Sequence, residues 1–572
     1  MNKISLFVIV AFSAWITYGS NEFNGRLNKQ EPLYDVLITG GNVIDGTGSE
    51  PITTDVGMID DRIVAIGDLS HAKAHKVIDA AGKVVTPGFI NMLSWAVESL
   101  LTDGRGLSDV VQGVTLEVFG EGNSMGPLTP ASKIDLQKSM DKSPNPVQIQ
   151  WITLGEYLEF LETKGVSPNV ASFVGATTVR INAVGYDNRE PTADELTFME
   201  AQVNDAMQEG AMGVGSSLIY APAFYAKTDE LIALNKVAAQ YGGMYITHMR
   251  NEGNQLLVAF DETLTIAKEA GIPAEVYHLK AAGKDNWPKM QQLFKKLETA
   301  NDNGLKITAD MYTYPAGATG LDAAMPPWVQ EGGHDAWAAR LGDPAIRAKV
   351  ITQMKTPSND WDNLYRAAGA EGILLPYFKN PALKQYTGMR LSDVAAARGT
   401  SVEDTIIDLV IADGTRVEAI YFLMSDANLV AKIKQPWVSF GSDAEASDPV
   451  EASKHGSTHP RAYGNFSRVL AKYVRDEKVI SLEEAVRKLS GLPASNLKIK
   501  DRGFIKKGYY GDVLVFDPAV VQDHATFAAP HKLSTGMSHV FINGVQVLAD
   551  GVHTGATPGR VVRGPGWTGW KK

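Results

Sequence analysis

The sequence predicts an α/β fold, a (β/α)₈ barrel of the TIM type with a small β-sandwich built from both chain ends. Three observations predict it: short β-prone runs fill both ends of the chain, apolar runs alternate with amphipathic helices in the middle, and two of the apolar runs end in histidine. The chain has 572 residues, 44% hydrophobic and 21% charged, which is enough for one large barrel and one smaller domain.

The first 20 residues resemble a secretory signal peptide. Lys3 precedes an apolar stretch over residues 4–16, and small residues follow near Gly19. An uncleaved anchor is the alternative, but the stretch is shorter than the roughly 20 residues that a membrane-spanning helix needs. We therefore expect an exported protein, periplasmic or secreted, with no stable membrane span once the signal is removed.

The two ends of the chain contain β-prone runs separated by turns and without helices. These runs span residues 34–38, 55–59, 62–66, 76–78, 512–516 and 539–548. We expect residues 31–86 and 497–565 to form the two parts of one sandwich, on either side of a barrel domain over residues 87–496.

The middle of the chain alternates between apolar runs and helices. The runs span residues 86–92, 113–120, 170–176, 213–216, 244–248, 274–278, 306–310 and 437–443. Helices are predicted over residues 192–209, which open with a capping box at Thr192 and Glu195, and over residues 254–270, before Gly271. Eight such strands favour a closed barrel, although a doubly wound sheet has the same local pattern. A segment rich in Trp, Gly and Pro, about residues 321–402, is predicted to be an insertion over the barrel mouth.

Charge and composition exclude several classes of function. The formal net charge is -11 and no basic run occurs, which argues against a nucleic-acid partner. The chain has no cysteine, so disulfides, a thiolate nucleophile and a cysteine metal ligand are excluded. Residues 122–126 match the G-x-S-x-G pattern of a serine hydrolase, but Pro127 and Pro130 follow where that motif needs a helix, so we treat the match as accidental.

Two histidines end neighbouring predicted strands, where barrel enzymes place their active sites. His248 and His278 are 30 residues apart, the length of one strand-helix-strand unit. Each alone is explained more simply as a core or rim residue, but together they predict a shared metal such as zinc, which favours imidazole ligands. Asp443 ends the eighth run, where it could bind the metal or pass a proton from the attacking water to a leaving amine.

Several short motifs follow one another in a fixed order. They are Pro87-Gly88-Phe89-Ile90, Gln112-Gly113-Val114-Thr115, Leu218-Ile219-Tyr220-Ala221-Pro222, Thr247-His248-Met249-Arg250, His278-Leu279-Lys280, Gly441-Ser442-Asp443, His459-Pro460-Arg461-Ala462-Tyr463 and His553-Thr554-Gly555-Ala556. Together they resemble the amidohydrolase superfamily, and within it the N-acyl-D-amino-acid deacylases, over about residues 34–564. The resemblance implies a barrel with a β-sandwich from both chain ends, and metal-dependent hydrolysis of a small-molecule amide.

The resemblance also implies roles for individual residues. Asp443 matches the catalytic aspartate, and Lys280 and Tyr220 are placed near the substrate carboxylate or the scissile group. Arg250 and Tyr312 are further candidates for substrate binding.

The chain departs from the family at two places. Leu93 and Trp95 stand at the histidine positions of a His-x-His motif, so we expect one zinc ion rather than two. The position of a cysteine ligand falls on Gly122, and a shift of one residue brings in Glu121, which would complete a set with His248 and His278. Glu117 and Glu98 are weaker alternatives to Glu121.

Other functions remain open from the sequence. One is another amidohydrolase activity, such as a dipeptidase, a cyclic-amide hydrolase or a hydrolase of an amide-bearing toxin or lipid. The other is a binding protein that has kept the barrel and lost the metal chemistry. The acyl group, the amino acid, its stereochemistry and the oligomeric state are not indicated by the sequence.

Overall fold

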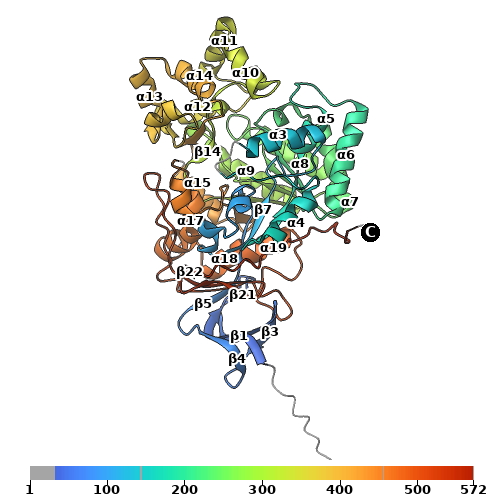
Figure 1. The fold of residues 1–572 in the computed structure, drawn as a ribbon, viewed down its shortest axis with the longest axis vertical. Helices are drawn as coiled ribbons and strands as arrows, with labels where there is room; N and C mark the ends of the chain where they lie inside the picture. Colours follow the sequence, from blue (N-terminus) through green and yellow to red (C-terminus); the bar gives the residue numbers. More distant parts are fainter. Residues whose placement is uncertain (1–32, 142–144, 455, 571–572) are drawn as a thin grey trace, which may run out of the picture.

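A computed structural model describes residues 33–141, 145–454 and 456–570. The predicted signal peptide at residues 1–20 lies outside these residues, so export stays a prediction. Within the described ranges, no helix combines the length and apolar character needed to cross a membrane. Along its long axis the molecule has a β-sheet built from the chain ends, a central barrel, and a helical insertion at the opposite end (Figure 1).

The barrel predicted from the sequence is confirmed. Its strands, in chain order, are β6 (Phe89–Asn91), β7 (Val114–Phe119), β8 (Asn169–Ser172) continued by β9 (Val174–Gly175), β10 (Gly213–Ser217), β11 (Met244–His248), β12 (Ala274–Val276), β13 (Ile307–Met311) and β18 (Val438–Phe440). The pairs recorded between them are parallel. Two bonds complete the ring: Met92 N–H donates to Phe440 O at 3.2 Å, and Phe173 N–H donates to Phe119 O at 2.8 Å. Strands one to eight therefore fall within or beside the eight predicted runs.

Helices cover the outside of the barrel, and their ends follow from local sequence. The Thr192 hydroxyl of α6 (Ala193–Gln208) accepts from Glu195 N–H at 3.3 Å, and the Glu195 carboxylate accepts from Thr192 N–H at 2.7 Å, the predicted capping box. Helix α8 (Leu256–Ala270) ends at Gly271, whose φ of +66° is the left-handed conformation that glycine adopts without strain. The other barrel helices are α1 (Ser99–Thr102), α2 (Leu107–Val110), α3 (Pro130–Met140), α4 (Leu154–Lys164), α5 (Ala176–Ala183), α7 (Thr228–Gln240), α9 (Lys289–Asp302), α15 (Asp426–Ile433), α16 (Pro449–Ser453), α17 (Arg461–Arg468), α18 (Leu482–Val486) and α19 (Leu492–Asn496).

Both chain ends enter one hydrogen-bonded sheet of nine strands. The strands are β1 (Leu33–Val43), β2 (Ile52–Ile59), β3 (Arg62–Gly67), β4 (Lys73–Asp79), β5 (Val84–Pro87), β19 (Val513–Phe516), β20 (Met537–Ile542), β21 (Val545–Ala549) and β22 (Val552–His553). Strand β5 joins the two ends, because it pairs with β1 on one side and with β19 on the other. Val36 and Ile63 from one end share a buried cluster with Val513 and Phe541 from the other.

The segment between β13 and β18 forms a smaller unit with its own sheet and core. The sheet contains β14 (Gly317–Gly320), β15 (Ile373–Leu375), β16 (Met389–Arg390) and β17 (Glu418–Tyr421), and the helices are α10 (His334–Leu341), α11 (Pro344–Lys355), α12 (Leu364–Ala368), α13 (Leu391–Arg398) and α14 (Val402–Asp413). Trp337, Val350 and Ile406 lie in its buried core. The unit opens at β14 and closes at β17, so it extends beyond 321–402 at both ends and covers the barrel mouth (Figure 1).

Candidate active site

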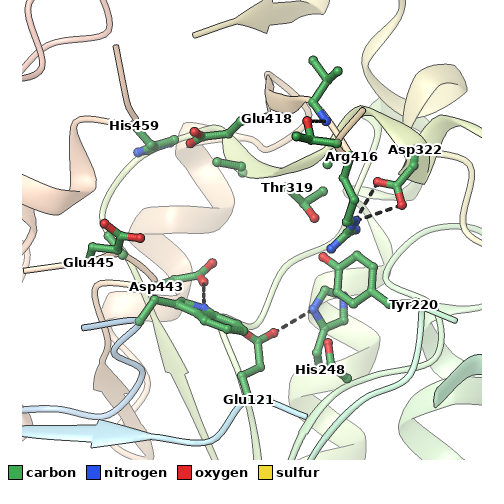
Figure 2. Close-up of a pocket in the computed structure, with 18 of the residues that line it drawn as sticks. Glu121, Tyr220, His248, Thr319, Asp322, Arg416, Glu418, Asp443, Glu445 and His459 are labelled. Atoms are coloured by element: carbon green, nitrogen blue, oxygen red, sulfur yellow. Dashed lines mark hydrogen bonds and ion pairs between the residues drawn. The ribbon is translucent and has the colours of Figure 1, made fainter. Parts of the chain in front are cut away.

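A cavity of about 1330 Å³ lies between the carboxyl ends of the barrel strands and the insertion. Glu121, His248 and Asp443 line it from the barrel, and Thr319, Asp322 and Glu418 line it from the inserted segment (Figure 2). This is the end of a barrel at which active sites are built, because the strand-end loops converge there. The site is therefore shared between the barrel and the insertion.

Glu121, His248 and His278 come together in the floor of this cavity. His248 is the last residue of β11, and Glu121 and His278 each follow a strand by two residues, β7 and β12. Glu121 Oε1 lies 3.0 Å from His248 Nδ1 and 3.0 Å from His278 Nε2. All three side chains are buried, and their candidate ligand atoms lie within 4.8 Å of one another. Three of the four residues that the sequence nominated as metal ligands, Glu121, His248 and His278, thus meet in the described structure.

The donor set fits a metal ion by its chemistry. Burial acts to raise the pKa of Glu121, but His278 and His248 outweigh it and hold that pKa well below its usual range. Burial acts to lower the pKa of His248, whereas Glu252 and Glu121 raise it to about 9. Two imidazoles and one carboxylate aimed at a common point form a three-ligand set that zinc hydrolases use, with the fourth position left for water.

Glu252 is a further residue of the site that the sequence analysis did not identify. Its carboxylate oxygens lie 3.3 Å from His248 Nε2 and 3.3 Å from His278 Nδ1, the ring nitrogens that face away from Glu121. Lys280 Nζ donates to both oxygens at 2.8 and 2.9 Å. Burial acts to raise the pKa of Glu252, but Lys280 and the two histidines hold it well below its usual range. A carboxylate on the outer nitrogens of metal-binding histidines fixes their orientation and raises their basicity.

Asp443 stands beside this centre, held through both of its oxygens. Trp95 Nε1 donates to Asp443 Oδ1 at 3.1 Å, and Arg461 Nη1 forms an ion pair with Asp443 Oδ2 at 2.6 Å. The role of Asp443 as a metal ligand stays a prediction: among the described residues, the group whose candidate ligand atoms lie within 4.8 Å of one another contains Glu121, His248 and His278 and not Asp443. Asp443 lines the cavity, which agrees with the predicted role in proton transfer. Burial raises the pKa of Asp443 against the opposing effect of Arg461.

The backbone is strained at two of these positions. His278 has a φ of +34° and Asp443 a φ of +51°, in the left-handed region that costs a non-glycine residue about 1–3 kcal/mol. Surrounding hydrogen bonds hold both residues there: His278 N–H donates to Asp310 Oδ1 and Asp443 N–H donates to Leu93 O, each at 2.8 Å. Strain of this kind is typical of residues whose direction matters for function.

Of the predicted substrate-binding residues, the structure brings three into the cavity and excludes one. Lys280, Tyr220 and Tyr312 line it, and the buried Tyr312 hydroxyl has no hydrogen-bond partner among the described residues. The ammonium of Lys280 is already paired with Glu252. The prediction for Arg250 needs correction, because its guanidinium binds the Glu262 carboxylate and two backbone carbonyls and does not line the cavity.

Other polar residues singled out in the sequence do not join the group of candidate metal ligands. Glu117 is fully buried in the barrel, where Asn91 Nδ2 donates to it at 2.9 Å and to Asp109 at 3.0 Å. Glu98 lines the cavity but does not belong to the cluster of metal-ligand atoms. The Ser124 hydroxyl donates to Gly126 O at 2.6 Å rather than to a side-chain base, as a nucleophilic serine would, which agrees with an accidental match to the serine-hydrolase pattern.

Arg461 is a cation of the cavity lining that the sequence indicated only as part of a motif. It is 4% exposed, its Nε has no hydrogen-bond partner among the described residues, and its guanidinium lies 4.5 Å over the Tyr312 ring. His459 contacts the main chain beside it: His459 Nδ1 accepts from the Arg461 main-chain N–H at 3.0 Å, and His459 Nε2 lies 3.0 Å from Ala316 O. The signal was the motif of residues 459–463, which lies just after the eighth strand.

The fold and site define a barrel with a three-donor candidate metal site at its mouth, and comparisons with known proteins agree. The sequence matches the amidohydrolase family over residues 76–548. It is 32% identical to the D-aminoacylase of Alcaligenes xylosoxydans xylosoxydans over 535 residues, which cover 92% of this chain and 97% of that relative. The chain therefore belongs to the amidohydrolase family, which confirms the resemblance drawn from the motifs.

Two solved structures bear on the metal centre. N-acyl-D-glutamate deacylase from Bordetella bronchiseptica, complexed with zinc and a phosphonate mimic of the tetrahedral intermediate, superposes with a TM-score of 0.77 and 28% identity. A D-aminoacylase structure, reported with a binuclear metal centre, one-metal activation and second-metal attenuation, superposes with a TM-score of 0.76 and 32% identity. Each alignment covers 93% of this chain and 100% of the other.

Proposed function

We propose that this protein is a metal-dependent deacylase that hydrolyses the amide bond of N-acyl-D-amino acids with one zinc ion. The observation that carries the proposal is the convergence of Glu121, His248 and His278 in the barrel-mouth cavity, with Glu252 behind both histidines. The D-aminoacylase and N-acyl-D-glutamate deacylase relatives support the substrate class.

The catalytic arrangement follows from the groups around the cavity. A zinc ion held by His248, His278 and Glu121 would lower the pKa of a water molecule and polarise the scissile carbonyl. Asp443 accepts the proton of the attacking water and passes it to the leaving nitrogen. Its raised pKa helps the first of these transfers, because a weakly acidic carboxylic acid has a conjugate base that takes up a proton more readily than an ordinary aspartate.

Substrate binding is assigned to the groups that retain free donors. The Arg461 guanidinium is a buried cation at the cavity wall, so it suits the carboxylate of an N-acylamino acid. The unpartnered Tyr312 hydroxyl beneath it can donate to the same carboxylate or to the acyl oxygen. The cavity of about 1330 Å³ exceeds the roughly 300–1,000 Å³ of most small-ligand pockets, which leaves room for an acyl chain.

The count of one ion rests on the first barrel strand. Leu93 and Trp95 occupy the positions at which the family carries the His-x-His pair, and neither side chain offers a metal donor. We therefore propose that the second metal position is lost while the three-donor position remains.

The test is hydrolysis of matched N-acyl-D- and N-acyl-L-amino acids by chelator-stripped protein, with and without added zinc. Turnover of the D substrates should require zinc, and His278→Ala should lose both zinc and turnover. His524→Ala, which changes an exposed histidine that does not line the cavity, is the matched control and should behave as wild type. Absence of zinc binding and of hydrolysis would instead favour a binding protein, and ring opening of cyclic amides would favour a different amidohydrolase activity.

We also propose that the protein is exported. The charged and apolar pattern of residues 1–20 supports this. Fractionation of the native producing cells, followed by amino-terminal sequencing of the mature protein, tests it; intact residues 1–20 in the cytoplasmic fraction would contradict it.

A further inference from the structure

Trp95 occupies one of the lost histidine positions, and its indole reaches the centre of the site. Trp95 Nε1 lies 3.0 Å from Glu121 Oε2 and 3.1 Å from Asp443 Oδ1, and the N–H is directed so that it donates to both. A single donor thus joins the carboxylate that faces the histidines to the carboxylate that transfers the proton.

The indole N–H reduces the repulsion between the two carboxylates. Glu121 and Asp443 come from the ends of the second and eighth strands, on either side of the first, and both act on the same cavity floor. Two neighbouring carboxylates repel each other unless a cation or a shared donor stands between them. In a binuclear centre a second cation can reduce the repulsion between the two carboxylates. In this protein the indole N–H of Trp95 lies between Glu121 and Asp443 and donates to both.

The bridge also fixes the direction of the Glu121 carboxylate. Oε2 accepts the indole N–H, so Oε1 is the oxygen left to face His248 Nδ1 and His278 Nε2, each at 3.0 Å. Asp443 is fixed in the same way, since Oδ1 accepts from Trp95 and Oδ2 pairs with Arg461. Removal of the N–H would free both carboxylates to rotate.

Main-chain hydrogen bonds hold the Trp95 segment next to the loop that carries Asp443. Trp95 N–H donates to Ala444 O at 2.9 Å, and Ser94 forms a parallel bridge with Ala444, the residue after Asp443. Leu93, the other substituted position, is fully buried, and its carbonyl accepts from Asp443 N–H. The two changes from the His-x-His pattern therefore form one packed unit with the loop that carries Asp443.

We propose that Trp95 is a positioning residue that replaces the second cation of the family's centre: its N–H bridges Glu121 and Asp443 and holds them for catalysis around a single ion. The inference rests on the proposed zinc-dependent function. It assigns Trp95 no contact with the reacting atoms, so its effect must appear through the metal and through Asp443.

The first test uses Trp95→Phe, which keeps an aromatic ring and removes the donor. Zinc affinity, measured by competition with a chromophoric chelator, should fall about tenfold, the effect typical of losing an outer hydrogen bond to a metal ligand. The kcat should fall by a similar factor with KM little changed, because the substrate contacts are untouched. Trp328→Phe is the control, since it removes an indole bond to Gln353 in the insertion, and it should match wild type in both readouts.

The second test restores the family pattern with Leu93→His/Trp95→His. If the indole stands in for a cation, this double variant should bind two zinc ions per chain by elemental analysis, against one in wild type. Zinc affinity and kcat of Trp95→Phe equal to those of Trp328→Phe would overturn the proposal, as would a folded double variant that still binds one ion. These failures differ from failure of the proposed function, in which the wild-type protein itself would bind no zinc or hydrolyse no amide.

Discussion

Replacement of Glu252 by glutamine removes one charge from the centre of the site while keeping the size of the side chain. Lys280 would then hold a buried ammonium without its carboxylate, since both Glu252 oxygens accept from it at 2.8 and 2.9 Å. Loss of one partner of a buried ion pair costs about 3–5 kcal/mol, so the free energy of unfolding should fall by about that amount. His248 and His278 would lose the carboxylate on their outer nitrogens, and zinc affinity should fall about 10–100-fold.

Two further variants separate the effects on stability and on the metal. Glu262→Gln breaks the ion pair with Arg250 outside the cavity, and it should leave zinc affinity unchanged. Glu252→Gln combined with Lys280→Met removes both charges, so it should recover most of the unfolding free energy while zinc affinity stays low.

The measurements are urea unfolding of the metal-free proteins and zinc competition with a chelator. If Glu252→Gln bound zinc as tightly as Glu262→Gln does, the role assigned to Glu252 would be refuted. If the double variant were no more stable than Glu252→Gln, the unpaired Lys280 would not be the source of the instability.

Three further predictions concern the barrel and the cavity. Leu93→Ala should cost about 2–5 kcal/mol of stability because it empties a fully buried site, yet keep the zinc by elemental analysis; loss of the metal would count against the single-ion centre. Tyr312→Phe should lower kcat/KM about tenfold through loss of one substrate hydrogen bond, and unchanged kinetics would remove Tyr312 from the site. Burial raises the pKa of Glu117 from 4.5 to about 7. Between these two pH values the folded state keeps a proton that the unfolded chain releases. The stabilisation that this proton gives the folded state is therefore complete below pH about 4.5 and is lost as the pH rises through about 7. Glu117→Gln should therefore gain up to about 3 kcal/mol relative to wild type between pH 5 and pH 8 in denaturant unfolding, and a constant difference across that range would contradict the assignment.

The sequence predicted those parts of the fold that depend on local patterns. The barrel strands are short apolar runs, and the capping box at Thr192 and the glycine after α8 mark helix ends with residues that interact locally. His248 and His278 were found by the same reasoning, because a polar residue that ends an apolar run must lie at the carboxyl end of a strand.

The remaining parts depend on contacts between distant segments. Glu252 lies in the loop after β11, and its direction is set in part by its N–H bond to Asp362, 110 residues away in the insertion. Arg250, two residues earlier, is equally polar but faces the opposite side toward Glu262. Trp95 could be recognised from the sequence as a lost ligand, whereas its bridge between Glu121 and Asp443 requires three strand ends to be placed together. Spacing alone does not determine these directions.

The central claim is a single catalytic ion held by Glu121, His248 and His278. Its most direct test is to titrate zinc into stripped protein at a concentration well above the dissociation constant while following deacylation of an N-acyl-D-amino acid. Activity should rise linearly and reach its plateau at one zinc per chain. A plateau at two zinc ions per chain, or full activity before any zinc is added, would contradict the claim.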